Sequence, residues 1–363
     1  MTGGRVGFAI LGPGKVAHTH AAALSQLPHT HLRAVCGRDA ARTAAFAQAY
    51  GARPYTDLEE LLGQSDVQAI ILCTPHPQHA LQAELAARAG KHVLVEKPMA
   101  LSVTDADRMI RAARESGVKL GVVSQRRLYE SVQRVRQAIV RAALQRPVLA
   151  TLNLLGWRGP EYYAMDAWRG SWAGEGGGVL VNQAVHQLDL LQWLMGEVQE
   201  LSADWANLNH PEIEVEDTAV ATLRFRSGAL GSIVVSNSQR PGLWGRLHIH
   251  GSNGASVGVQ TDGGSSFVAG VTQQVEPPLN DLWTVPGEEA LLAGWQAADR
   301  QRAQDLDVMT HYHALQVSDF ASAVLEDRPP LVPGEEGRKT VELIEAIYRA
   351  GRTRSWVRFL LSD

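Results

Sequence analysis

The first 125 residues alternate between short apolar segments and amphipathic segments of helical period, and this alternation limits most strongly what the chain can fold into. Short apolar segments bounded by turn residues are typical of strands that are buried on both faces of a sheet. A helical segment follows each of them, so consecutive strands should run parallel, with right-handed crossovers. The predicted strands span residues 5–12, 31–37, 67–74, 92–98 and 119–125, and the predicted helices span 16–27, 39–51, 79–90 and 103–117.

After Pro147 the pattern changes to longer strand-like segments, which predict a second, largely antiparallel sheet. Helices at 180–195 and 309–326 are expected to pack against it. The fold class is therefore α/β, with an N-terminal domain at 1–125 and a C-terminal α/β domain at 126–363. A last helix, near 337–350, is expected to return to the first domain. The strands predicted in the second half span residues 148–156, 218–228, 229–238 and 246–251.

Composition excludes several classes of protein. The chain has 363 residues, which indicates two domains, and its net charge of −4 without any Lys/Arg-rich run argues against nucleic-acid binding. The apolar run at the N-terminus is broken by Gly12-Pro13-Gly14, and no other segment resembles a membrane span. The two cysteines do not form a disulfide framework, which favours a reducing compartment and hence the cytoplasm.

A glycine loop follows the first predicted strand. The segment "GPGKVAH" matches G-x-G-x-x-A at Gly12, Gly14 and Ala17, at the start of the first helix. Such a loop lets main-chain N–H groups approach a pyrophosphate at the helix N-terminus. The motif alone is weak, and its strand–turn–helix setting at the start of the chain strengthens it.

The end of the second strand indicates which dinucleotide binds. An acidic residue there would bind the ribose hydroxyls of NAD, but the sequence has Gly37 followed by Arg38. Gly37 removes the carboxylate that would repel a 2′-phosphate, and Arg38 is suited to bind that phosphate. NADP is therefore the preferred cofactor. NAD remains the alternative, because Asp39 would be the acidic residue that binds the ribose hydroxyls if that position lay one residue later in the chain.

An apolar helix in the second half keeps three polar residues. In "GGGVLVNQAVHQLDLLQWLMG" the residues Asn182, His186 and Asp189 are spaced i, i+4 and i+7, which places them on one face of a continuous helix. Polar groups in such a setting need partners. They form either a satisfied structural network or the wall of a functional cavity, and for Asp189 taken alone the structural role is favoured.

These segments, together with "CTPHPQHA" (73–80) and "AGKHVLVEKPMA" (89–100), resemble the Gfo/Idh/MocA family of NAD(P)-dependent oxidoreductases over nearly the whole chain. The resemblance implies a Rossmann domain followed by an α/β domain with a large open sheet, through which homodimers or homotetramers form. It also implies hydride transfer between nicotinamide and a hydroxyl carbon of a sugar, a polyol or a derivative.

The resemblance also implies roles for individual residues. Lys97 matches the family's lysine, which contacts the substrate hydroxyl, and His186 matches its acid/base histidine, so these two are the expected catalytic residues. Many members have Asp where this chain has Asn182, which puts in doubt any proton relay through that position. The expected cofactor-binding residues are Gly12, Gly14, Val16, Ala17, Gly37, Arg38, Thr74, Pro75, His76, His79, Glu96, Lys97, Gln125, Trp168 and Arg169.

The chemistry agrees with these roles. Oxidising an alcohol needs a base whose pKa lies near neutrality, which suits His186, and a nearby ammonium such as that of Lys97 stabilises the alkoxide. Trp157 and Tyr163 lie in an aromatic segment at 156–174 and are expected to bind the substrate together with Asn182 and Asp189. For any one of the aromatic residues, attachment of the loop to the core is an equally strong alternative. Arg126 and Arg127 could reach an acidic substrate, although the case for surface roles is at least as strong.

His311 and His313 lie two residues apart, and no further ligands stand at metal spacing, so no metal site is expected. Two alternatives to a dehydrogenase remain. One is a regulator that senses the cofactor without turnover, and the other is an enzyme that uses transient oxidation to cleave a glycosidic bond.

Overall fold

The computed structural model describes residues 4–243, 245–261 and 278–360. The chain divides into two compact units. Unit 1 comprises Met1–Gln125 and Met309–Val341, and unit 2 comprises Arg126–Val308 and Glu342–Asp363.

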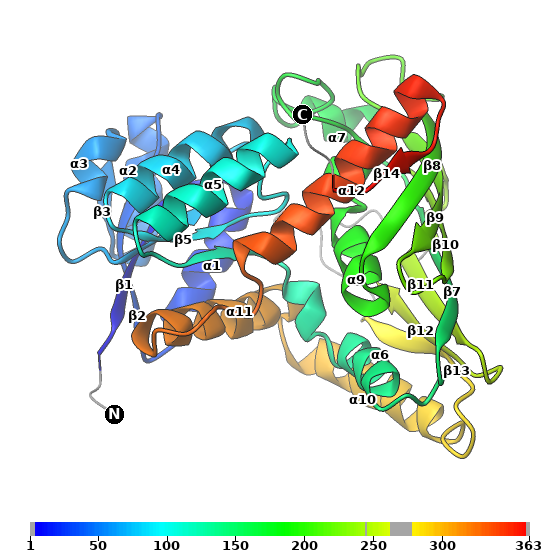
Figure 1. Cartoon of the computed structure of the whole chain (residues 1–363). Coiled ribbons are helices and arrows are strands. Elements are labelled where there is room, and N and C mark those ends of the chain that lie inside the picture. Colours follow the sequence, from blue (N-terminus) through cyan, green and yellow to red (C-terminus); the bar gives the residue numbers. More distant parts are fainter. Residues whose placement is uncertain (1–3, 244, 262–277, 361–363) are drawn as a thin grey trace. The chain divides into compact units, whose positions relative to one another are not determined.

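Unit 1 is built on a six-stranded sheet with the order β3-β2-β1-β4-β5-β6, in which all neighbouring strands are parallel. This confirms the predicted doubly wound sheet (Figure 1). The short edge strand β3 was not predicted, because its three residues include a proline and lack an apolar run. The strands are β1 (Val6–Leu11), β2 (Thr30–Cys36), β3 (Arg53–Tyr55), β4 (Ala69–Leu72), β5 (His92–Val95) and β6 (Leu120–Val122).

Helices cover both faces of this sheet. Side chains of β1 alternate between the two cores, so that Phe8 and Ile10 join one and Ala9 and Leu11 join the other. One core contains side chains of α1 (Lys15–Ser25), α2 (Ala40–Tyr50) and α11 (Val308–Leu325). The other contains side chains of α3 (Leu58–Leu62), α4 (His79–Arg88), α5 (Val103–Glu115) and the first part of α12 (Gly334–Thr353).

The position of α11 corrects one prediction. The helix was expected against the second sheet, but Val317 and Phe320 are buried in the core of unit 1, where the Phe320 ring contacts Phe8. The periodic pattern identified the helix correctly. It carries no information about which sheet receives its apolar face.

Unit 2 is built on an eight-stranded sheet with the order β13-β12-β11-β7-β10-β9-β8-β14. Among these described strands only the β7–β10 pair is parallel, which confirms the mostly antiparallel prediction. The strands are β7 (Pro147–Leu155), β8 (Val198–Ala206), β9 (Thr218–Phe225), β10 (Leu230–Ser236), β11 (Gly245–Gly251), β12 (Ser256–Thr261), β13 (Leu279–Trp283) and β14 (Val357–Arg358).

One face of this sheet is buried and the other is largely open. Alternate residues of β9 from Ala219 to Phe225 are buried, whereas Val220, Thr222 and Arg224 between them are exposed. On the buried side α9 packs on β7 and β11, and α6 packs on β12 and β13. Besides the part of α12 from Glu342 onward, the described helices of unit 2 are α6 (Glu130–Val140), α7 (Pro160–Ala164), α8 (Val179–Asn182), α9 (Val185–Met195) and α10 (Leu291–Asp305).

Both cysteines, Cys36 and Cys73, are free and buried. Among the described residues, no helix is both long and apolar enough to cross a membrane.

Candidate active site

The glycine loop leads from β1 into α1. Gly12 has a φ of +93°, and a Cβ at this residue would lie 2.9 Å from the main chain of Cys73. Gly14 is the N-cap of α1, and no described side chain caps this end of the helix. The first N–H groups of α1 therefore retain the anion-binding character of a helix N-terminus. Val16 and Ala17 pack into the core behind the loop.

The residues after β2 surround Gly37. A Cβ at Gly37 would lie 2.5 Å from Cδ of Pro13 in the glycine loop, so no side chain fits there. Arg38 is exposed. Asp39 is the N-cap of α2, and its carboxylate accepts a hydrogen bond of 3.0 Å from the main-chain N–H of Arg42. The acidic group that follows Arg38 in the chain is therefore already engaged in capping a helix.

The turn after β4 is fastened by His79. Its Nδ1 lies 3.0 Å from the carbonyl oxygen of Pro98, and its Nε2 lies 2.8 Å from that of Thr74. The side chain is fully buried, and this burial lowers the pKa of His79 although the two carbonyls oppose the shift. The ring thus holds the Thr74–Pro75 turn against the Lys97–Pro98 segment. His76, in the short 3₁₀ helix His76–Gln78, lies edge-on to His79.

The segment after β5 holds Glu96 and Lys97. Glu96 is buried: its Oε1 lies 2.7 Å from Nε2 of His20, and its Oε2 accepts a 3.1 Å hydrogen bond from the main-chain N–H of Lys97. Burial acts to raise the pKa of Glu96, but the hydrogen bond from His20 and the charges of His20, His313 and Lys97 lower it to about 2. The carboxylate therefore stays ionised beside the main chain of Lys97. Lys97 itself is half-buried.

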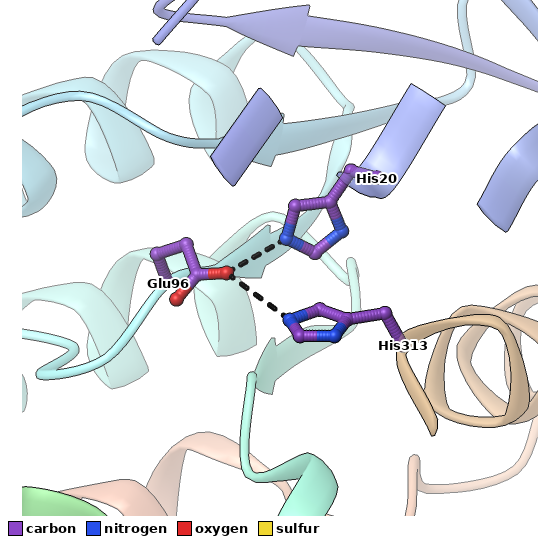
Figure 2. A group of neighbouring side chains, drawn as sticks. All are labelled: His20, Glu96 and His313. Carbon is purple, nitrogen blue, oxygen red and sulfur yellow. Dashed lines mark hydrogen bonds and ion pairs between the residues drawn. The ribbon is translucent and has the colours of Figure 1, made fainter. Parts of the chain in front are cut away.

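Figure 2 shows the cluster of His20, Glu96 and His313, which come from α1, the end of β5 and α11. Within the described ranges, this is the one group of at least three His, Cys, Asp or Glu side chains that is compact enough to compare with a metal site. The 2.7 Å contact between His20 and Glu96 is shorter than the separation of about 3.3 Å between two ligands of one tetrahedral zinc ion. His313 Nδ1 also lies 2.7 Å from the carbonyl oxygen of Met309. We therefore describe the group as a hydrogen-bonded cluster.

In unit 2, the predicted helix 180–195 is broken into α8 and α9, which corrects the prediction of one continuous polar face. The main-chain N–H of Ala184 bonds to the carbonyl of Val179, five residues back, at 2.8 Å. This wider turn changes the angle between Asn182 on α8 and His186 on α9 from that of ideal i, i+4 spacing. His186 is 7% exposed and Asn182 is half-buried.

The start of α8 is held by a buried carboxylate. Glu216 accepts hydrogen bonds from the main-chain N–H groups of Gly178 and Leu180, at 2.9 and 3.0 Å. Burial raises the pKa of Glu216 to about 7. The residue fixes the glycine run that leads to Asn182.

Asn182 lies in a buried polar network. Its Nδ2 donates to Oε1 of Glu175 and to the hydroxyl of Tyr162, the latter at 3.0 Å. Arg169 Nη1 and Gln183 Nε2 lie 2.5 and 2.9 Å from the same hydroxyl oxygen, whose two lone pairs are thus shared among three N–H groups. Neither His186 nor Asp189, which share the sequence pattern with Asn182, takes part in these contacts.

Asp189 has a buried partner within unit 2, in agreement with the structural role favoured for it alone, and its substrate contact stays a prediction. Arg127 Nε lies 2.9 Å from Oδ2 of Asp189, and Nη2 lies 2.6 Å from Oδ1. Both side chains are buried, and the guanidinium also lies over the Trp193 ring. Arg127 and Arg126 are both buried, so the surface role, one of the two alternatives for them, is wrong.

The aromatic segment of unit 2 surrounds His210. The rings of Trp157 and Tyr163 lie 5.7 and 5.4 Å from it. His210 Nδ1 lies 2.9 Å from Asp217, and Nε2 lies 2.7 Å from the carbonyl oxygen of Arg158. Both ring nitrogens thus face acceptors, which ties the segment to the start of β9.

Two further predicted residues of this segment lie side by side. The Arg169 guanidinium lies 4.5 Å from the ring centroid of Trp168 and 4.3 Å from that of Tyr162. Gln125, which is also among the expected cofactor-binding residues, is buried at the start of the 3₁₀ helix Gln125–Leu128.

Sequence reasoning missed Glu175, Glu216 and the His20–Glu96–His313 cluster, and it placed Tyr162 in the aromatic segment without a role of its own. Glu175 stands in a run of glycines, which drew attention away from its charge. His20 lies three residues after Ala17 in the first helix, on its buried side, and that spacing is the one signal available for it. The partners of the other residues lie too far along the chain for any local pattern to identify them.

Residues 6–124 match the sequence model described as oxidoreductase family, NAD-binding Rossmann fold, and residues 132–257 match the GFO/IDH/MocA C-terminal domain. The myo-inositol 2-dehydrogenase of Thermotoga maritima is 31% identical over 343 residues, which is 93% of each chain. The 1,5-anhydro-D-fructose reductase of Ensifer adhaerens is 33% identical over 60% of this chain and 65% of its own.

Solved structures give the same match. The WlbA dehydrogenase of Bordetella pertussis, in complex with NADH and UDP-GlcNAcA, superposes with a TM-score of 0.88 at 32% identity and covers 100% of both chains.

Proposed function

The chain belongs to the Gfo/Idh/MocA family of oxidoreductases, and from that premise we propose that it transfers hydride between a nicotinamide cofactor and a hydroxyl-bearing carbon of a sugar, a polyol or a sugar derivative. The observation that carries the proposal is the Glu96-Lys97-Pro98 segment in unit 1. Through His79 it is fastened to the turn that packs on the glycine loop. The turn and the His79 contacts thereby connect Lys97 to the glycine loop at the anion-binding start of α1.

We assign the proton transfer to His186 and the stabilisation of the alkoxide to Lys97. Imidazole exchanges protons near neutral pH, and a fixed positive charge favours the oxyanion that develops as hydride leaves. The buried carboxylate of Glu96 beside Lys97 supports this assignment, because it favours the ammonium form of that lysine. In the reducing direction the proton returns to the substrate oxygen.

NADP is the proposed cofactor, with NAD as the alternative. An exposed Arg38 follows a glycine that accepts no side chain, and Asp39 already caps α2. Both features favour a 2′-phosphate over a bare ribose at this end of β2. The WlbA structure contains NADH, so NAD binding is the outcome that would correct this assignment.

The aromatic segment supports a carbohydrate substrate. Trp157 is half-buried and Tyr163 is buried, and together with Asn182 they combine flat apolar faces with hydrogen-bonding groups, as sugar sites do. The related proteins named above act on inositol and anhydrofructose, and the WlbA complex holds a nucleotide sugar acid. All three chemical classes therefore belong in a substrate screen.

We also propose a homodimer or homotetramer that forms through the open face of the unit 2 sheet. Leu149, Val220 and Leu230 of β7, β9 and β10 are exposed on that face, among short polar side chains. A second copy would bury them. Light scattering after size exclusion tests this, and a strictly monomeric protein would contradict it. The free cysteines favour a reducing compartment such as the cytoplasm.

The reaction is tested by following nicotinamide absorbance with purified protein, NADP(H) or NAD(H), and a panel of aldoses, polyols, sugar acids, nucleotide sugars and glycosides. Turnover with at least one sugar or polyol, and with an oxidised carbon in the product, is the expected result. A protein that binds the cofactor tightly but turns over none of these would contradict an enzymatic role. Glycoside cleavage without net change in absorbance would instead identify transient oxidation.

A further inference from the structure

The amide of Asn182 has a fixed orientation. Its Nδ2 donates to Oε1 of Glu175 and to the hydroxyl oxygen of Tyr162. An amide nitrogen carries two hydrogens, so these two contacts use both. Any further hydrogen bond that Asn182 makes must therefore use Oδ1, and Oδ1 is an acceptor.

Glu175 cannot move away from this contact. Its side chain is 1% exposed, and its Oε2 accepts a 2.6 Å hydrogen bond from the main-chain N–H of Gly170. Its own main-chain N–H donates to the carbonyl of Ser171 at 2.9 Å. A buried carboxylate is stable only with such partners, so Asn182 and Glu175 depend on each other.

Tyr162 has a further partner of its own in Gln183. Gln183 Nε2 donates to its hydroxyl at 2.9 Å, and Gln183 Oε1 accepts from Asn237 Nδ2 at 2.9 Å. Both ends of Gln183 thus have partners, and in this arrangement its nitrogen faces Tyr162. Arg169 Nη1 points at the same hydroxyl oxygen, which has two lone pairs for three N–H groups, so the contact that fixes the Asn182 amide is the one with the Glu175 carboxylate, which can only accept.

We propose that Glu175 is a positioning residue for the reaction: it turns Asn182 so that only the acceptor Oδ1 is offered to the substrate or to His186, and it carries the negative charge that an aspartate at residue 182 would otherwise hold. The inference rests on the proposed function. It also explains the residue type at 182, because an aspartate there would place two carboxylates within hydrogen-bond distance, and one of them would have to bind a proton.

The test exchanges the two groups. Glu175→Gln, Asn182→Asp and the double variant are compared with the wild type, using the substrate identified by the panel. In the double variant the oxygen of the new glutamine can still accept from the Gly170 N–H, and its nitrogen can donate to the new carboxylate. The Tyr162 hydroxyl can donate to the same carboxylate. The donor and acceptor positions are thus complementary again, with the charge moved from residue 175 to residue 182.

Each single variant should lower kcat/KM about 10- to 100-fold at pH 8. The double variant should recover to within about threefold of the wild type. The loss in Asn182→Asp should shrink as the pH falls to 6, because the two carboxylates then share a proton. Purely structural damage would not give this dependence on pH. Glu161→Gln, which removes an exposed carboxylate of the same loop, is the matched control and should leave kcat/KM within about twofold.

Additive losses, with the double variant worse than either single variant, would overturn the proposal. So would a double variant whose melting temperature recovers while kcat/KM does not, because the pair would then serve stability alone. A wild-type protein without turnover on any substrate of the panel would instead contradict the proposed function, and this inference would fall with it. The two failures are therefore distinguishable.

Discussion

Gly37 and Pro13 pack so closely that a Cβ at residue 37 would lie 2.5 Å from Cδ of the proline. The absence of a side chain at the end of β2 is therefore required by the glycine loop itself. Glycine at this position consequently serves two purposes, since it lets the loop close and it leaves the site without a carboxylate.

Cofactor preference should depend on Arg38 and not on a residue introduced at 37. Arg38→Ala should weaken NADPH binding about 10- to 100-fold and leave NADH binding unchanged, because a charge-assisted bond to a phosphate contributes about 1.5–3 kcal/mol. Gly37→Asp should weaken both cofactors, because Pro13 must shift. Quenching of tryptophan fluorescence by each cofactor measures the affinities. If the wild type binds NADH more tightly than NADPH, Arg38 does not bind the 2′-phosphate.

The Arg127–Asp189 ion pair should stabilise the fold without contacting substrate. Asp189→Asn removes the negative charge and one of the two acceptor oxygens that face the buried Arg127 guanidinium. This should lower the free energy of unfolding by about 3 kcal/mol. KM of the folded variant should stay within about twofold of the wild type. Urea denaturation and steady-state kinetics measure the two effects. Asp204→Asn, on an exposed carboxylate of β8, is the control and should change stability by less than about 0.5 kcal/mol. A large rise in KM with unchanged stability would restore the substrate role.

The Glu96 cluster should make stability depend on acid pH. The folded pKa of about 2 lies below the ordinary value of 4.5, so the carboxylate stabilises the fold above pH 4.5 and this contribution, about 3 kcal/mol, is lost as the pH falls towards 2. Removing a partner in His20→Leu should raise the pKa of Glu96 and move the loss to higher pH. Urea denaturation between pH 3 and 7 measures the shift. His311→Leu, on a half-buried histidine of α11, should leave the profile in place. Parallel profiles for wild type and His20→Leu would contradict the ionised carboxylate.

The Rossmann sheet could be predicted because its central strands are buried on both faces and therefore appear as uninterrupted apolar runs. Strand β3 has no such run, since it lies at the sheet edge and contains Pro54. The catalytic candidates Lys97 and His186 were identified from motifs, and their roles remain predictions. The glycine loop was identified in the same way, and Gly14 indeed caps α1.

The remaining features depend on contacts that no local pattern contains. Arg127 meets Asp189 across 62 residues of chain, and Glu96 meets His20 across 76. The break between α8 and α9 comes from one main-chain bond that spans five residues, which helical periodicity does not reveal. Periodicity therefore placed Asn182 on a continuous helix face, whereas its actual environment is set by Glu175 and Tyr162.

The most direct test of the central claim is a single-turnover measurement of cofactor reduction by bound substrate in the wild type, Lys97→Ala and His186→Ala. Circular dichroism and cofactor binding confirm that each variant is folded. We predict that, at a saturating concentration of cofactor, each variant transfers hydride about 10²- to 10⁴-fold more slowly than the wild type, with the neutral-pH dependence lost in His186→Ala. Hydride transfer at the wild-type rate in both variants would contradict the assignment of the chemistry to Lys97 and His186.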